Sequence, residues 1–200
     1  MAIKCILFDA DGVVIRNSEI FSTQYEKKYN LPSGEMLPFF EGEFQNCIIG
    51  KADLKEILQI WLPKWNWEKT TDEFLEFWFE MGNNPDEKML EIVKKLRKKG
   101  IKCCIATNQE KYRTQFMRKN MKFGELFDFV FSSAEIAYKK PEKEFYEFIL
   151  NYLNKKGIEA EETLFFDDSE KNINEAKKVG INGFFYKNFE EFEEVVKDFL

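Results

Sequence analysis

Strand-like and helix-like segments alternate along residues 84–200, and this alternation restricts the fold more than any other feature of the sequence. Each strand-like segment is a short apolar run bounded by turn residues, which is typical of strands buried on both faces. These runs lie at 101–106, 127–131, 163–166 and 183–186, and a further one at 3–8. Segments with helical spacing follow at about 110–120, 141–156, 169–179 and 189–199. Because such alternation makes the strands parallel, we expect an α/β fold with a doubly wound parallel sheet.

The segment 16–83 interrupts this alternation, because it carries helical patterns alone. Helices are expected at 21–29, ending before Pro32, and at 52–62 and 71–81. Aromatic residues recur on them at helical spacing, as is typical of packed interiors. The sequence therefore predicts a core domain formed by 1–15 and 84–200, and an inserted α-helical cap domain formed by 16–83.

The return to the core is expected at Asn84-Pro85-Asp86-Glu87, which has the features of a helix start. Asn84 is a capping residue, the proline suits the first turn, and the acidic residues suit the positive end of the helix dipole. We expect this helix to stop at Gly100, because glycine is common just beyond a helix C-terminus.

Charge and hydropathy exclude several classes of partner. The net charge is −6, and the lysines are interleaved with glutamates, so we expect no nucleic-acid partner. The basic run 94–99 is explained by the end of a helix, where cations suit the dipole. No apolar run approaches the roughly 18 residues that span a bilayer, and no secretion signal is visible at the N-terminus. The prediction is a cytoplasmic protein without a membrane partner.

Two residue types restrict the chemistry further. The chain has no histidine, which excludes a histidine base, nucleophile or metal ligand. Its four cysteines show no metal-ligand spacing, and we expect buried free thiols of a reducing compartment. Acid–base chemistry at neutral pH must therefore come from carboxylates, lysine, tyrosine, cysteine or bound water.

Polar residues follow the predicted strands at the points where ligands bind in parallel α/β sheets, beyond the carboxyl ends of the strands. These residues are Asp9 and Asp11 after the first strand, Thr107 and Asn108 after the second, Lys140 before the next helix, and Asp167 and Asp168 after the fourth. Each group alone has an ordinary explanation as a turn, a helix cap or a solvated surface residue. Together they supply complementary charges at one edge of one sheet.

The chemistry of this set is specific. Several carboxylates at one edge repel each other unless a cation joins them or one takes a proton, and all-oxygen ligation suits Mg²⁺. A hydroxyl, backbone amides and a lysine are what phosphoryl oxygens require. One carboxylate can act as the nucleophile, and a second, two residues on, can protonate the leaving oxygen.

The four groups resemble, in order, the four motifs of the haloacid-dehalogenase-like hydrolases. The matching segments are 8–14, with sequence FDADGVV, Thr107-Asn108, Lys140-Pro141 with Phe145, and Phe166-Asp167-Asp168-Ser169 with Asn172. The resemblance covers the whole chain, and the helical insert resembles the small α-helical cap of that family. It implies a Rossmann-like core and a Mg²⁺-dependent enzyme.

The resemblance also implies a role for each matching residue. Asp9 would be the nucleophile and a metal ligand, and Asp11 the general acid and base, with its backbone carbonyl on the metal. Thr107 and the Asn108 amide would hold the phosphate, and Lys140 would pair with Asp9 and the phosphate. Asp168 would bind the metal directly, and Asp167 through water or from a second shell.

Some positions leave alternatives open. Pro141 favours Lys140 over Lys139 as the catalytic lysine. Ala137 stands where a glycine is common, and Asn172 stands where some relatives have another acid, so it either contacts metal-bound water or caps and packs.

The retained Asp11 favours a phosphatase over a dehalogenase, because a leaving halide needs no proton. The expected substrate is a small phosphorylated metabolite, cleaved through a phospho-Asp9 intermediate by a monomer or homodimer. The alternatives are a phosphoglucomutase-like transfer, for which 47–52 could supply sugar contacts, and a non-catalytic binding module on the same fold.

Overall fold

The computed structural model describes residues 2–16 and 19–200, and it contains one five-stranded parallel sheet in the order β3-β2-β1-β4-β5. The strands are β1 (Cys5–Phe8), β2 (Lys102–Thr107), β3 (Phe129–Ser132), β4 (Thr163–Asp167) and β5 (Asn182–Phe185). Strand β1 pairs with β2 and β4 on its two sides, so the first strand lies at the centre. The expected α/β fold with a doubly wound parallel sheet is confirmed.

The sheet is buried on both faces because its strands are apolar without alternation. Ile6 and Phe8 point to one hydrophobic cluster, while Cys5 and Leu7 point to the other. The central strand is fully buried at all four positions. This burial fixes the strand ends, and the residues that follow them, on a rigid edge.

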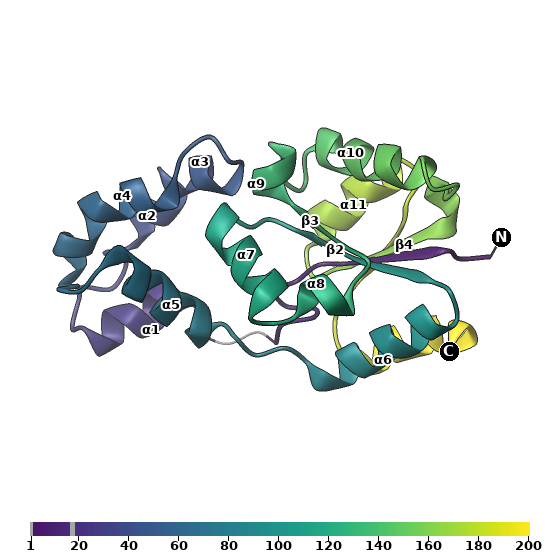
Figure 1. Ribbon diagram of the computed structural model, residues 1–200, viewed down its shortest axis with the longest axis horizontal. Coiled ribbons are helices and arrows are strands. Elements are labelled where there is room, and N and C mark those ends of the chain that lie inside the picture. The colour runs from purple at the N-terminus through teal and green to yellow at the C-terminus, as the bar shows by residue number, and fades with distance from the viewer. Residues whose placement is uncertain (1, 17–18) are drawn as a thin grey trace.

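Helices cover the two faces of the sheet, as Figure 1 shows. The helices of this part of the chain are α6 (Glu87–Lys98), α7 (Lys111–Lys119), α8 (Phe123–Leu126), α9 (Ser133–Ile136), α10 (Lys143–Asn154), α11 (Glu170–Lys178) and α12 (Phe189–Val196), with 3-10 turns η2 (Ala160–Glu162) and η3 (Lys197–Phe199). Buried side chains of α6 and α12 join the cluster of Ile6 and Phe8. Those of α10 and α11 join the cluster of Cys5 and Leu7.

The segment between β1 and α6 forms a separate helical lobe at the left of Figure 1. Its helices are α1 (Phe21–Lys28), α2 (Leu37–Glu41), α3 (Phe44–Ile48), α4 (Leu54–Trp61) and α5 (Thr71–Met81), with the 3-10 turn η1 (Leu62–Trp65). The lobe packs around large buried rings, among them Tyr25, Phe39, Trp65 and Phe74. The aromatic stripes are thus interior packing at positions such as Tyr25 and Phe74, as expected, whereas Phe21 and Trp78 are half-buried and line a cavity.

Several predicted boundaries were wrong for local reasons. Asn84 does not cap α6, because the Asp86 side chain accepts the N–H of Lys88 and Met89 and starts the helix later. Pro85 instead pairs with Ile15 in an isolated bridge.

Elsewhere the helices are shorter than predicted or were not predicted at all. Helix α10 begins at Lys143, two residues beyond the expected Pro141. Helix α4 begins at Leu54, because the Asp53 side chain accepts the N–H of Lys55. Short helices such as α2, α3, α8 and α9 were not predicted, since four or five residues carry no usable periodicity.

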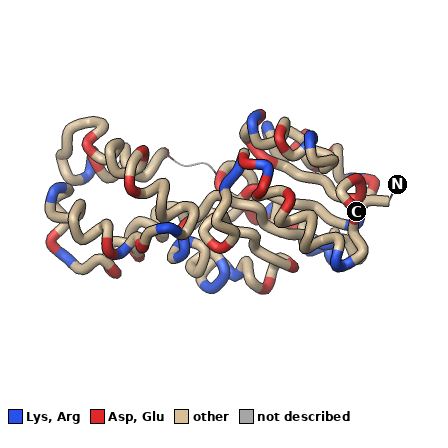
Figure 2. The backbone as a smooth tube through the Cα atoms, turned by 90° about the horizontal axis from the view of Figure 1, so that it is seen from above, with Lys and Arg blue, Asp and Glu red and all other residues tan. Residues whose placement is uncertain are grey.

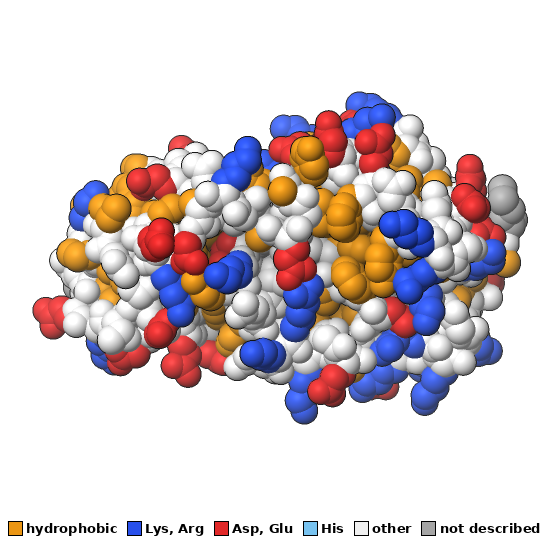
Figure 3. All heavy atoms as spheres, turned by 45° about the horizontal axis from the view of Figure 1, so that its top comes forward, with side chains coloured by type: hydrophobic (Ala, Val, Ile, Leu, Met, Phe, Trp, Pro, Cys, Tyr) orange, Lys and Arg blue, Asp and Glu red, His pale blue; other side chains and the backbone are white. Residues whose placement is uncertain are grey.

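Charged residues of both signs are scattered over both lobes, as Figure 2 shows along the backbone. The space-filling view of Figure 3 shows acidic and basic side chains interspersed on one face of the molecule. The expectation that nucleic acid is not a partner stays a prediction. Within 2–16 and 19–200, no helix combines the length and apolarity that crossing a membrane requires.

Candidate active site

Asp9 is held at the carboxyl edge of the sheet by its own backbone. Its N–H donates to the carbonyl of Phe166 in β4 at 2.8 Å. The carbonyl of Ala10 then accepts the N–H of Ile15 at 2.8 Å, which closes a tight loop. Gly12 within this loop has φ of 83°, a conformation that favours glycine. The carboxylate that follows the central strand is therefore fixed in place.

Lys140 lies between two carboxylates at this edge. Its ammonium is 2.8 Å from Asp9 Oδ1 and 2.7 Å from Asp167 Oδ2, and the Lys140 side chain is only 1% exposed. Burial by itself lowers the pKa of Lys140, but the negative charges of Asp9 and Asp167 outweigh it and raise the pKa. The lysine therefore stays protonated and neutralises part of the carboxylate charge. The neighbouring Lys139 instead donates to Gln45 Oε1 at 2.8 Å.

Asp9 has an unusually high affinity for a proton. Burial raises its pKa to about 7, although the charge of Lys140 acts in the opposite direction. The nearby Asp167 raises the pKa further. An added cation would relieve this repulsion, because it favours the charged form of both carboxylates.

Three carboxylates form a group that could hold a metal ion. One oxygen each of Asp9, Asp167 and Asp168 lies within 4.8 Å of the others. Asp167 is fully buried, and it accepts hydrogen bonds from the N–H of Ser169 at 2.8 Å and from Asn172 Nδ2 at 2.9 Å. Asp168 is exposed. The group does not include the carboxylate of Asp11. All-oxygen donors of this kind suit Mg²⁺.

The residues after β2 lie beside the lysine. Thr107 is the last residue of the strand and is almost fully buried. The side chain of Asn108 makes two hydrogen bonds with the backbone of Lys140: Nδ2 donates to its carbonyl at 2.9 Å, and Oδ1 accepts its N–H at 2.8 Å. The structure thus brings the predicted residues of four separate segments to one edge, and the side-chain amide of Asn108 is engaged by protein.

Asp11 has a partner that the sequence did not indicate. Gln109 Nε2 donates a hydrogen bond to Asp11 Oδ2. The backbone carbonyl of Gln109 itself accepts a hydrogen bond from the hydroxyl of Ser132 at 2.9 Å. The available signal was position alone, because Gln109 directly follows Thr107-Asn108.

Two further charged residues near the edge were also missed. Glu110 is almost fully buried and caps α7, accepting the N–H of Tyr112 at 2.7 Å. Burial raises its pKa to about 7, although these backbone hydrogen bonds act in the opposite direction. Arg113 reaches the helical lobe and donates to the carbonyls of Phe79 and Gly82 at 2.7 and 2.9 Å. Their positions depend on how the lobes pack, which local sequence does not encode.

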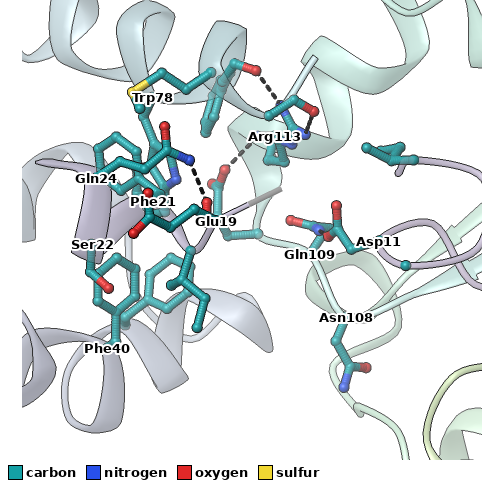
Figure 4. Close-up of a pocket in the computed structure, with 18 of the residues that line it drawn as sticks. Asp11, Glu19, Phe21, Ser22, Gln24, Phe40, Trp78, Asn108, Gln109 and Arg113 are labelled. Atoms are coloured by element: carbon teal, nitrogen blue, oxygen red, sulfur yellow. Dashed lines mark hydrogen bonds between the residues drawn. The ribbon is translucent and has the colours of Figure 1, made fainter. Parts of the chain in front are cut away.

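A cavity of about 540 Å³ lies between the helical lobe and the sheet edge. Figure 4 shows Asp11, Asn108 and Gln109 on the side of the sheet, and Phe21, Phe40 and Trp78 on the side of the helices. A volume of this size is typical of small-molecule sites. The carboxylate–lysine edge therefore adjoins a space that can hold a substrate.

Comparison with known proteins agrees with this geometry. The family model of the haloacid dehalogenase-like hydrolases matches residues 6–185. A pyrophosphatase of Bacillus mycoides is 26% identical over 187 residues, covering 86% of this chain and 78% of that protein. A sesquiterpene phosphatase of Aspergillus oryzae is 32% identical over 99 residues, covering 50% of this chain and 49% of that protein. The chain thus matches about half the length of this second relative.

Solved structures share the fold over nearly the whole chain. An enzyme of the haloacid dehalogenase family from Bacteroides thetaiotaomicron has a TM-score of 0.81 and 22% identity, covering 98% of both chains. The same enzyme in complex with magnesium and inorganic phosphate has a TM-score of 0.76 and 21% identity, covering 97% of this chain and 99% of that one. With the family match over residues 6–185, the chain belongs to the haloacid dehalogenase-like hydrolases.

Proposed function

We propose that the protein is a Mg²⁺-dependent phosphatase that hydrolyses a small phosphomonoester through a phosphorylated Asp9. One observation carries the proposal: the buried ammonium of Lys140 lies within 2.8 Å of Asp9 and Asp167, beside the exposed Asp168. This arrangement leaves a reactive carboxylate next to cationic charge, which phosphoryl transfer requires. Relatives named as a phosphatase and a pyrophosphatase, and a structural neighbour with magnesium and phosphate, support it.

The residues present fit a magnesium ion. Asp9 and Asp168 would bind it directly together with the backbone carbonyl of Asp11, and Asp167 would act through water or by orienting the lysine. When bound, the ion would neutralise charge that develops on the transferred phosphoryl group. Asn172 donates to both oxygens of Asp167, at 2.9 and 3.1 Å, and so supports this set by positioning that carboxylate.

The proposed reaction has two steps. In the first, an oxygen of Asp9 attacks phosphorus, the bond from phosphorus to the leaving oxygen breaks, and Asp11 gives that oxygen its proton. In the second, water attacks the acyl phosphate, Asp11 takes a proton from the water, and Asp9 is released as a carboxylate with free phosphate. Gln109 holds the Asp11 carboxyl for both transfers.

Binding of the phosphate would fall to Thr107, the backbone amide of Asn108 and Lys140. Thr107 and Asn108 lie at the carboxyl end of β2, and Lys140 contacts Asp9 just beyond β1, which supports this assignment. We also propose the division into a core domain of 1–15 and 84–200 and a cap domain of 16–83, with the cavity between them. The separate helical lobe of Figure 1 supports it.

Phosphate release from p-nitrophenyl phosphate and acetyl phosphate tests the proposal. We expect release with Mg²⁺ and none with EDTA, and we expect Mg²⁺ to restore activity after chelation. A folded, Mg²⁺-saturated protein that hydrolyses neither compound would contradict the phosphatase assignment.

A further inference from the structure

We infer that the substrate is a phosphate monoester of an uncharged, largely apolar alcohol, and that the cavity of about 540 Å³ binds this alcohol. The inference rests on the proposed phosphatase function and names its substrate class. It follows from three properties of the described lining residues: their aromatic rings, their side-chain amides, which are already hydrogen-bonded to protein, and their charged groups.

The wall of the cavity on the helical lobe is aromatic and rigid. Phe21 stacks on Trp78 with centroids 5.0 Å apart, and Phe40 meets the same indole edge-on at 5.5 Å. Phe44 packs against Phe40 at 5.3 Å. Leu37 completes this wall. Rings that are held by one another are preorganised, so an apolar guest binds without reordering them.

The polar side chains of the cavity are mostly committed to protein partners. Among the described lining residues, three carry side-chain amides, and each is already hydrogen-bonded. Asn108 holds the backbone of Lys140, Gln109 donates to Asp11, and Gln24 donates to the carbonyl of Glu19. A sugar needs several free donors and acceptors in a buried site, because its hydroxyl groups lose water there. This wall offers few of them.

The charges of the cavity disfavour a second anionic group on the substrate. The described lining residues include three acids, Asp11, Glu19 and Glu110, and two arginines. Arg16 is paired with Asp86 at 3.0 Å, and Arg113 donates to two backbone carbonyls. Both guanidinium groups are therefore already engaged by protein acceptors, so a second anionic group of a nucleotide or a diphosphate would lose its water here without gaining a free arginine partner. An uncharged leaving group needs no such partner.

A series of n-alkyl phosphates of increasing length tests the inference, with acetyl phosphate as the reference whose small leaving group does not reach the wall. We expect kcat/KM to rise about threefold to fourfold for each added methylene until the cavity is filled. A hexose phosphate, a nucleoside monophosphate and pyrophosphate should be poorer than hexyl phosphate by about tenfold or more. The inference would be overturned if one of these three compounds were the best substrate, or if kcat/KM did not depend on the length of the alkyl chain.

This outcome is separable from failure of the phosphatase assignment. If acetyl phosphate is hydrolysed with Mg²⁺ but alkyl length has no effect, the reaction stands and the substrate class falls. If acetyl phosphate and every ester are inert, the phosphatase assignment itself fails.

A matched pair of variants locates the effect. Leu37 lines the cavity and is 48% exposed, and Ile60 is 59% exposed on α4 away from the lining residues. We expect Leu37→Gln to lower the ratio of kcat/KM for octyl phosphate to that for acetyl phosphate by about fivefold to tenfold. Ile60→Gln should leave the ratio unchanged. Equal ratios in wild type and Leu37→Gln would contradict binding at this wall.

Discussion

The side chain of Asn108 makes two hydrogen bonds with the backbone of Lys140, accepting its N–H at 2.8 Å and donating to its carbonyl at 2.9 Å. The two residues are 32 positions apart in the sequence. These two hydrogen bonds fix the backbone of Lys140, whose buried ammonium contacts Asp9 and Asp167. Asn108 is thus a positioning residue for the lysine, besides offering its backbone amide to the phosphate.

Removing the two hydrogen bonds of the Asn108 side chain should lower both activity and stability. We expect Asn108→Ala to reduce kcat by about tenfold to a hundredfold, because small displacements of a catalytic group are costly. Unfolding in urea should show a loss of about 1–3 kcal/mol. Asn108→Asp keeps the acceptor for the Lys140 N–H and loses the donor, so it should fall in between. Unchanged kcat in Asn108→Ala would contradict the positioning role.

Lys140 and Lys139 provide a matched test of the lysine assignment. Lys140→Met leaves Asp9 and Asp167 buried together without their cation. We expect it to abolish activity and to lower the free energy of unfolding at neutral pH by about 3–5 kcal/mol. Lys139→Met removes one hydrogen bond to Gln45, so it should cost about 1 kcal/mol and retain activity. If both variants lost activity equally, the choice of Lys140 would be wrong.

Asp11→Asn should slow the reaction according to the leaving group. Alkyl phosphates need a proton on the leaving oxygen, whereas p-nitrophenolate leaves without one. We expect kcat for an alkyl phosphate to fall by about a hundredfold or more, and kcat for p-nitrophenyl phosphate to fall much less. Equal losses on both substrates would exclude the acid role.

Glu110 should make the protein less stable as pH rises toward neutrality. Its pKa is raised from 4.5 to about 7, so between these values the folded protein holds a proton that the unfolded chain has released. The stabilisation is complete below 4.5 and is lost as pH rises through 7. The contribution changes by up to about 1.4 kcal/mol per pH unit.

Chemical unfolding of wild type and Glu110→Gln across this range measures the contribution. The free energy of unfolding of wild type, minus that of Glu110→Gln, should fall as pH rises, because Glu110 titrates and glutamine does not. Glu56→Gln, on the exposed side of α4, serves as the control and should show no such trend. If the free energy of unfolding changed with pH in the same way in wild type and in Glu110→Gln, the raised pKa of Glu110 would be refuted.

The sheet and its ligand edge could be predicted from the sequence because both depend on local patterns. Apolar runs define the strands, and in a parallel sheet the residues after them meet at one edge. Asp9 and Asp167 were predicted in this way, and Lys140 from its place before Pro141, although the three residues lie far apart in the chain. The neighbouring Pro141 favoured Lys140 over Lys139, and of these two lysines only Lys140 lies beside Asp9 in the structure.

The cavity and its neighbours could not be predicted, because they depend on how the helical lobe packs on the core. Arg113 touches Gly82 and Phe79 across this boundary, and Ser133 Oγ donates to the carbonyl of Ile48 at 2.6 Å. No spacing in the sequence encodes such contacts. The conformation of Ala137 could not be predicted either. Its φ of 66° lies in the left-handed region, which explains why a glycine suits this position.

The most direct test of the account is to trap the phosphorylated enzyme at Asp9. Protein turning over an alkyl phosphate with Mg²⁺ is quenched and treated with borohydride, which reduces an acyl phosphate of aspartate to homoserine, and the peptides are sequenced by mass spectrometry. We predict homoserine at position 9 in wild type, and none with EDTA or in a folded, inactive Asp9→Asn variant. Turnover without modification of Asp9, or near-native activity of Asp9→Asn, would contradict the central claim.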